Sequence, residues 1–198
     1  MLTADIEGFV LTGGASARMG TPKALIEFDG KPLGRRAVEV LEPICRRVRT
    51  VGDVKIDGVQ SMADVRAENE KASIFGLYSA LRNCKTQFAA VLACDLPFVT
   101  PEVFSILLER FEIGCDAVIP RDGNGWPQPF CAVYAKEPSL KKLEQFISLS
   151  GREVREFLSS ANLIYVDSDD LGTPASHEEV FFNINTPDDL ERARAMTR

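Results

Sequence analysis

The sequence has little of what membrane, secreted and nucleic-acid-binding proteins need. No uninterrupted apolar run in its 198 residues approaches the ~20 residues of a membrane span, and its start, MLTADIEGF, lacks the basic and apolar regions of a secretory signal. The 29 acidic residues outnumber the 23 basic ones, and the formal net charge of −6 argues against general nucleic-acid binding. We therefore expect a cytoplasmic protein with no membrane or nucleic-acid partner. We also expect a monomer or a weak oligomer, although composition and charge do not determine this.

Histidine and patterned cysteine are also scarce. His177 is the one histidine, so a Ser-His-Asp or Cys-His mechanism would have to depend on that residue alone. The five cysteines are widely spread and form no CxxC pair, which argues against a zinc site or a disulfide framework. We expect buried free thiols.

Short apolar segments alternate with amphipathic segments along the whole chain. Strands are predicted over 6–12, 48–51, 88–93, 116–120, 130–135 and 163–166. Helices are predicted over 32–45, 73–84, 139–149 and 150–160, and from Thr100 and Thr186 onward, with Ser73 as a cap and a capping box at Ser150 and Glu153. The alternation predicts one α/β domain over residues 1–198, with a mostly parallel sheet.

Ligands of such sheets bind outside the carboxyl ends of the strands, so the loop after Thr12 is a first candidate. Gly13 and Gly14 allow close approach to the backbone, whose amides can bind phosphate oxygens. Arg18 and Lys23 add the positive charge that a triphosphate needs. The spacing is neither GxxxxGK[ST] nor GxGxxG, and a glycine-rich turn with two solvated basic residues remains the alternative.

The second candidate loop follows the apolar segment 88–93 and carries Asp95. Magnesium is typically bound by one or two carboxylates together with substrate phosphate oxygens, so Asp95 is a candidate metal ligand. The alternative is an ordinary turn residue before the predicted helix.

Three motifs resemble those of the molybdenum cofactor guanylyltransferases. GFVLTGGASARMGTPKAL, from Gly8, is similar to the signature LxGGxSxRMGxxKxL of nucleotidyltransferases that act on molybdopterin; ACDLPF, from Ala93, resembles the metal-binding segment of this branch; and FNINTPDDL, from Phe182, resembles its C-terminal motif NxNTPxDL. The resemblance implies a Rossmann-like, three-layer α/β/α fold similar to that of nucleotide-diphospho-sugar transferases. It also implies Mg²⁺-dependent transfer of GMP from GTP to molybdopterin, with release of pyrophosphate.

The resemblance also implies roles for individual residues. Lys23 and Arg18 would stabilise the reacting phosphates and Asp95 would hold the metal. Asn183 and Asn185 would contact molybdopterin, although Asn185 also fits helix-entry chemistry before Thr186. The residues implied to contact the nucleotide are Leu11, Thr12, Gly13, Gly14, Arg18, Lys23, Asp64, Gly76 and Asp95.

Two segments depart from the family pattern. The base-reading segment GPLxG is replaced by ASIFG, in which only Gly76 matches, and a loop that often carries His-Pro reads WPQP from Trp126. Trp126 could stack on a pterin or pack at a loop edge. Two other functions therefore stay open. One is a related enzyme that uses CTP or makes a nucleotide sugar, whose branches more often carry glycine at Cys94. The other is a non-catalytic GTP- or molybdopterin-binding protein, which would not need Arg18, Lys23 and Asp95 together.

Overall fold

The computed structural model describes residues 5–13, 20–64, 72–172 and 179–197. Its elements, in chain order, are β1 (Ile6–Leu11), η1 (Lys23–Leu25), β2 (Glu27–Phe28), β3 (Lys31–Pro32), α1 (Leu33–Leu41), β4 (Val48–Val51), β5 (Gln60–Met62), α2 (Ile74–Asn83), β6 (Phe88–Ala93), α3 (Pro101–Glu109), β7 (Ala117–Arg121), β8 (Cys131–Ala135), α4 (Lys136–Ser148), α5 (Val154–Ser159), β9 (Leu163–Asp167), η2 (Ser168–Asp170) and α6 (Pro187–Met196).

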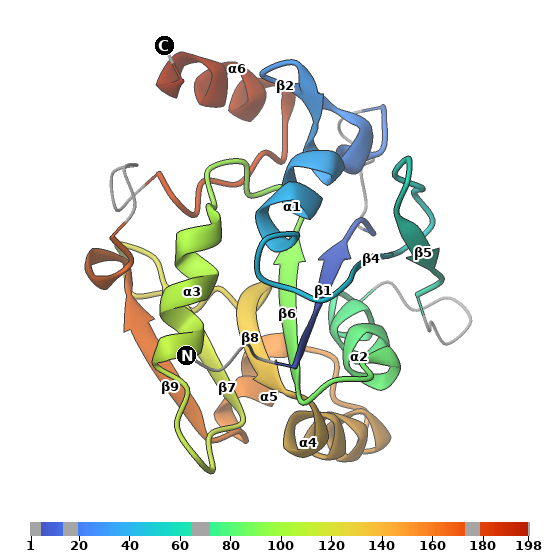
Figure 1. The fold of residues 1–198 in the computed structure, drawn as a ribbon, viewed down its shortest axis with the longest axis vertical. Helices are drawn as coiled ribbons and strands as arrows, with labels where there is room; N and C mark the ends of the chain where they lie inside the picture. The colour runs from blue at the N-terminus through green and yellow to red at the C-terminus, as the bar shows by residue number, and fades with distance from the viewer. Residues whose placement is uncertain (1–4, 14–19, 65–71, 173–178, 198) are drawn as a thin grey trace.

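A mostly parallel sheet forms the middle of the molecule (Figure 1). Its seven strands have the order β5-β4-β1-β6-β8-β7-β9. The neighbours β5, β4, β1 and β6 pair in parallel, as do β7 and β9, whereas β8 is antiparallel to both β6 and β7. The predicted fold class is confirmed, and β8 supplies the antiparallel exception.

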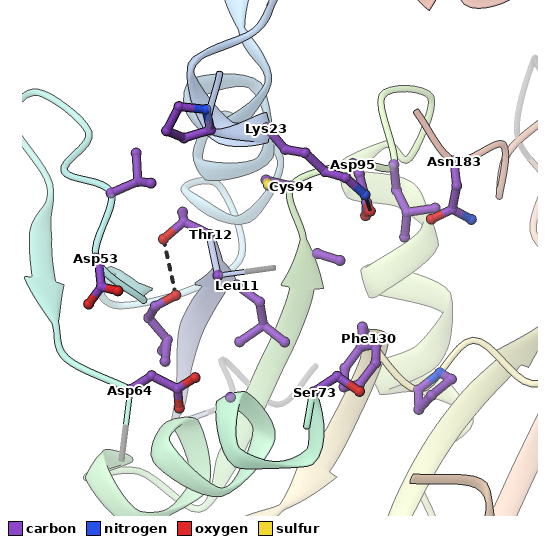
Figure 2. Close-up of a pocket in the computed structure, with 18 of the residues that line it drawn as sticks. Leu11, Thr12, Lys23, Asp53, Asp64, Ser73, Cys94, Asp95, Phe130 and Asn183 are labelled. Carbon is purple, nitrogen blue, oxygen red and sulfur yellow. Dashed lines mark hydrogen bonds and ion pairs between the residues drawn. The ribbon is translucent and has the colours of Figure 1, made fainter. Parts of the chain in front are cut away.

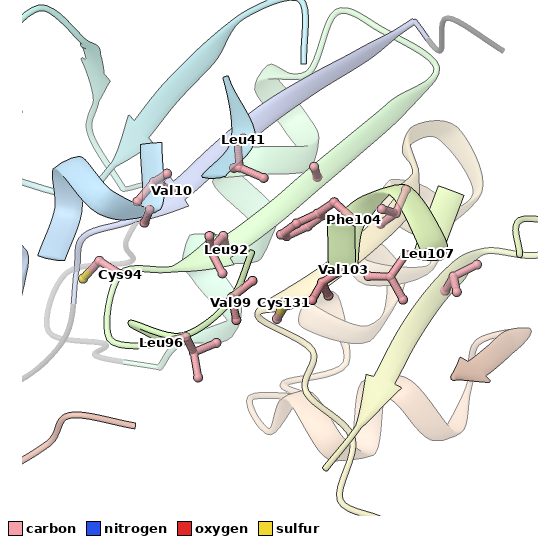
Figure 3. Close-up of a cluster of buried hydrophobic side chains, with 14 of the residues drawn as sticks. Val10, Leu41, Leu92, Cys94, Leu96, Val99, Val103, Phe104, Leu107 and Cys131 are labelled. Atoms are coloured by element: carbon pink, nitrogen blue, oxygen red, sulfur yellow. The ribbon is translucent and has the colours of Figure 1, made fainter. Parts of the chain in front are cut away.

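Alternating residues of the central strands supply two cores, one on each face of the sheet. Side chains of a strand point to opposite faces in turn, so Ile6 and Val10 of β1 join one core, while Phe9 and Leu11 join the other. The first core contains apolar side chains of α1 and α3, including Leu41 and Phe104 (Figure 3), and the second contains those of α2, α4 and α5. The sheet therefore lies between two helical layers.

A third, smaller core joins the segment of β2 and α1 to the C-terminal segment of the chain. Phe28 of β2 and Leu33 of α1 are buried together with Ile184 and with Ala193 of α6, and Figure 1 shows α6 beside β2. The Ile184 amide donates to the Asp95 carbonyl at 3.0 Å. This core holds the C-terminal motif against the loop that follows β6.

Three predicted helix ends are wrong. Helix α4 begins at Lys136 instead of 139, because Pro138 falls in the first turn, where no amide donor is needed. Ser150 adopts a left-handed φ of 66° and α5 begins only at Val154, without a capping box. Helix α1 ends at Leu41, short of 45.

Of the predicted helix caps, one makes no capping hydrogen bond and another does. Ser73 precedes α2, but its side chain makes no capping hydrogen bond. Thr186 and Asp189 form a capping box at the start of α6. The alternation of apolar residues thus predicted where the helices lie, whereas the capping residues predicted their first residues only in part.

All five cysteines are free, and four of them are buried, as predicted. Across the described residues, no helix has the length and apolar character needed to cross a membrane.

Candidate functional site

A cavity of about 630 Å³ opens at the carboxyl ends of β1, β4 and β6 (Figure 2). Pockets of this size commonly hold small-molecule ligands. It lies where the topology of a parallel sheet predicts a ligand. Its lining residues are Leu11, Thr12, Gly13, Pro22, Lys23, Val51, Asp53, Val54, Asp64, Ala72, Ser73, Gly76, Ala93, Cys94, Asp95, Leu96, Gln128, Pro129, Phe130 and Asn183.

The loop after β1 is held against the end of β4. The Thr12 amide and hydroxyl both donate to the Val51 carbonyl, at 2.9 and 3.0 Å. Gly52 has a φ of 126°, and a Cβ there would lie 2.7 Å from the Gly13 amide nitrogen. Only glycine therefore allows this close approach, which leaves Gly13 exposed at the cavity. Gly14 and Arg18 lie outside the described residues.

Lys23 and Asp95 form the charged centre of the cavity. The Lys23 ammonium nitrogen lies 2.8 Å from Asp95 Oδ2, and the two side chains are 17% and 18% exposed. The same ammonium donates to Asn185 Oδ1. Partial burial strengthens such charged contacts relative to open water. The structure thus brings together residues that lie 72 and 162 positions apart in the chain.

Two walls face each other across this centre. Figure 2 shows Asp53 and Asp64 on the wall beside β4 and β5, and Phe130 and Asn183 on the opposite wall. Asp64 Oδ1 accepts a hydrogen bond from the Ser79 hydroxyl at 2.9 Å, which ties it to α2. Since β4 and β8 lie on opposite sides of the β1–β6 pair, the sheet order itself separates the two walls.

The remaining predicted residues divide between lining and support. Gly76 lies in the first turn of α2 and lines the cavity near Leu11. Asn183 lines the cavity, and its amide nitrogen donates to the Phe181 carbonyl. Asn185 is not among the lining residues; its contact is with Lys23.

Sequence reasoning missed Asp53, Gln128 and Phe130. Asp53 follows a predicted strand, so the rule that pointed to the loops after Thr12 and Ala93 could have found it. No comparable signal marks Gln128 and Phe130, because they precede an antiparallel strand. Trp126 does not line the cavity; it is half exposed, and the Arg155 guanidinium lies 4.6 Å from its ring centre, which fits packing at a loop edge.

The donor groups around Asp95 bear on metal binding. Within the described parts of the chain, no three His, Cys, Asp or Glu side chains form a metal-binding group. Burial raises the pKa of the neighbouring Cys94 thiol to about 12, so Cys94 stays neutral and is a poor ligand. Asp95 alone fits Mg²⁺ bound mainly through substrate phosphates, because that ion needs only one or two protein carboxylates.

Comparisons with known proteins agree with this geometry. Residues 8–163 match the family model of the MobA-like NTP transferase domain. A probable molybdenum cofactor guanylyltransferase from Pelotomaculum thermopropionicum is 35% identical over 195 residues, covering 96% of this chain and 92% of the relative.

Solved structures extend the likeness to the fold. Molybdopterin-guanine dinucleotide biosynthesis protein A from Archaeoglobus fulgidus has a TM-score of 0.78 and 31% identity, covering 96% of this chain and 98% of that one. A 4-diphosphocytidyl-2C-methyl-D-erythritol synthase from Anaerococcus prevotii has a TM-score of 0.71 but 11% identity, covering 99% of this chain and 97% of that one, so it shows the shared fold alone. The family match, the relative and the fold agree: the chain belongs to the MobA-like NTP transferase family and is a nucleotidyltransferase.

Proposed function

We propose that the protein transfers GMP from GTP to the terminal phosphate of molybdopterin and releases pyrophosphate. The observation that carries the proposal is the Lys23–Asp95 ion pair at the centre of a cavity with two separate walls. Two walls suit two substrates, and the charged centre suits the phosphates at which they meet. The names of the relatives from Pelotomaculum and Archaeoglobus support the choice of molybdopterin.

In the proposed reaction, a phosphate oxygen of molybdopterin attacks the α-phosphorus of GTP. The bond between the α-phosphorus and the bridging oxygen breaks, and its electron pair leaves with pyrophosphate. A phosphate monoester is largely ionised near neutral pH, so the attack needs no strong general base. Positioning and charge stabilisation then supply most of the acceleration.

The chain's own residues divide this work. The exposed backbone at Gly13, which the bonds from Thr12 to Val51 hold in place, would bind the triphosphate together with Gly14 and Arg18. Lys23 would stabilise the charge that develops at the α-phosphate. Asp95 would hold Mg²⁺, which when bound neutralises phosphate charge.

Two carboxylates favour guanine at the wall beside β4 and β5, where we place the nucleotide base. Asp53 and Asp64 both line the cavity beside β4 and β5, and an ionised carboxylate only accepts hydrogen bonds. Guanine presents two adjacent donors, its N1–H and its 2-amino group, whereas the pairing edge of cytosine presents one donor and two acceptors. This chemistry supports GTP over CTP.

The test is pyrophosphate release with molybdopterin, Mg²⁺ and each of the four nucleoside triphosphates. We expect release with GTP, and a loss of turnover by orders of magnitude in Asp95→Asn with the fold retained. Asp57→Asn, an exposed carboxylate away from the cavity, is the matched control. Release with CTP but not GTP would overturn the nucleobase assignment. GTP binding without turnover would favour the non-catalytic alternative.

A further inference from the structure

The loop between β7 and β8 forms much of the cavity wall that lies opposite Asp53 and Asp64. Gln128, Pro129 and Phe130 from this loop line the cavity. The Gln128 amide donates to the Pro120 carbonyl at 2.9 Å across the loop, and the Cys131 amide donates to the Gln128 carbonyl at 3.0 Å where β8 begins. Gln128 therefore has a fixed backbone position at the edge of the cavity.

Asp122 organises the rest of the loop. Its Oδ1 accepts from the backbone amides of Asn124 and Trp126, both at 2.9 Å. Its own amide donates to the Trp126 carbonyl at 3.0 Å, and the stacking of Arg155 on the Trp126 ring ties this turn to α5. The loop is thus held by charge-assisted and backbone hydrogen bonds, which pre-organise whatever it presents to the cavity.

These contacts fix which way the Gln128 side-chain amide faces. Its Nε2 donates to Asp122 Oδ2 at 3.1 Å and to the Trp126 carbonyl at 3.3 Å. A carboxylate and a carbonyl can only accept, so the nitrogen must face them, and both its hydrogens are used. The amide oxygen lies on the other edge of the group, and no described residue donates a hydrogen bond to it. It is an oriented acceptor on a residue that lines the cavity.

We propose that the Gln128 amide oxygen is a specificity determinant for the second substrate and accepts a hydrogen bond from an N–H group of its ring system. This inference rests on the proposed function, in which that substrate is a pterin, a planar ring system with several N–H donors. Asn183 lies on the same wall, and Phe130 adds an aromatic ring there (Figure 2). Asp122 is a positioning residue, because it orients the Gln128 amide and the loop around it and does not itself line the cavity.

The test measures two constants at pH 8: the KM for molybdopterin, and the dissociation constant of a free pterin, whose binding is followed by its fluorescence. Gln128→Leu keeps the size of the side chain but removes the acceptor oxygen together with the Nε2 donor to Asp122 and Trp126. We expect the KM for molybdopterin and the dissociation constant of the pterin to rise about tenfold, the effect of ~1.4 kcal/mol. The GTP dissociation constant from calorimetry and the melting temperature should stay close to wild type. Asn124→Ala, at the exposed tip of the same loop, is the matched control and should change none of these values.

Gln128→His provides the rescue. Neutral histidine has one N–H group, from which Asp122 can accept a hydrogen bond, and one ring nitrogen that accepts. That second nitrogen can replace the Gln128 amide oxygen, so this variant should bind the pterin nearly as well as wild type. Unchanged pterin affinity in Gln128→Leu, equal losses for GTP and pterin, or failure of the rescue would overturn the inference. A wild-type protein that binds pterin through Gln128 but transfers no GMP would contradict the proposed function and leave the inference standing.

Discussion

The Lys23 ammonium contacts Asp95 from the middle of the chain and Asn185 from its C-terminal motif. A lysine side chain is flexible and loses considerable rotamer freedom when it is fixed. Two oxygen partners offset that cost and hold the cation at the centre of the cavity. At the scale of single residues, the site is therefore largely pre-organised, which is what electrostatic catalysis requires.

Replacing Lys23 separates catalysis from binding. If the cation stabilises charge that develops during attack, Lys23→Ala should lower kcat by ~10²–10³, by analogy with oxyanion-hole donors, and should weaken GTP binding much less. Arg18→Ala should instead weaken GTP binding more than kcat. Kinetics and calorimetry at two ionic strengths measure both effects, with Lys31→Ala, whose side chain is exposed, as control. Matched losses confined to affinity, and shrinking with salt, would show generic attraction instead.

At the scale of elements, the nucleotide side depends on how closely the turns after β1 and β4 approach. A hydrogen atom at Gly52 leaves room for the Gly13 amide, and the positive φ excludes most side chains. The turn is therefore both strained and crowded for any other residue.

Gly52→Ala should lower the free energy of unfolding by about 1–3 kcal/mol and weaken GTP binding, because the new Cβ would displace Gly13. Chemical unfolding and calorimetry measure the two effects. Gly58→Ala is the matched control, since Gly58 has a φ of 72° but nothing within 4 Å of its added Cβ. Equal loss of GTP affinity in both variants would contradict the crowding argument.

The start of α6 carries a pH-dependent contribution to stability. Burial opposes ionisation of Asp189, but hydrogen bonds from the Thr186 hydroxyl and the Asn185 and Thr186 amides outweigh it and lower the pKa of Asp189. A lowered native pKa means that the contribution is complete above the unfolded value of about 3.9 and is lost as the pH falls through the native value.

The free energy of unfolding of Asp189→Asn should therefore be lower than that of wild type at pH 6, and the difference should shrink toward pH 3. Urea unfolding across this range measures it. Asp188→Asn shares the same first helical turn but not the capping bonds, and so controls for the helix dipole. A difference that does not change with pH would rule out the capping carboxylate as the cause.

At the scale of the whole molecule, the two ends of the sheet have different tasks. The carboxyl ends of the strands line the cavity, whereas Glu7 and Arg49 form a buried ion pair of 2.7 Å toward the other end of β1 and β4. Glu7 also accepts from the Lys85 amide, and Arg49 donates to the Asn83 carbonyl, so this network joins the sheet to the end of α2.

Glu7→Ala should cost about 3–5 kcal/mol of unfolding free energy, because it leaves a buried charge without its partner. GTP affinity of the folded protein should hardly change, since the network is remote from the cavity. Asp5→Ala, which breaks an exposed pair with Arg46, should cost at most about 1 kcal/mol. Denaturant unfolding and calorimetry give both quantities, and a large loss of GTP affinity in folded Glu7→Ala would refute the division of tasks.

The sequence by itself determined the alternation of strands and helices, the family, and eight of the twenty residues that line the cavity, Lys23 and Asp95 among them. These features are local. Apolar periodicity reports which face of a segment is buried, and each of the three family motifs (the glycine-rich loop, ACDLPF and FNINTPDDL) is a continuous stretch of sequence. Capping at Thr186 was readable for the same reason, although the similar signal at Ser150 was overridden by a left-handed turn.

Only the tertiary structure decided which distant segments meet. The antiparallel direction of β8 places Gln128 and Phe130 on one wall of the cavity, and the small core around Ile184 leads Asn185 to Lys23 rather than to the cavity lining. The direction and order of strands depend on packing between residues far apart in the chain. A segment's own periodicity is the same whichever neighbour it pairs with, so it cannot encode these choices.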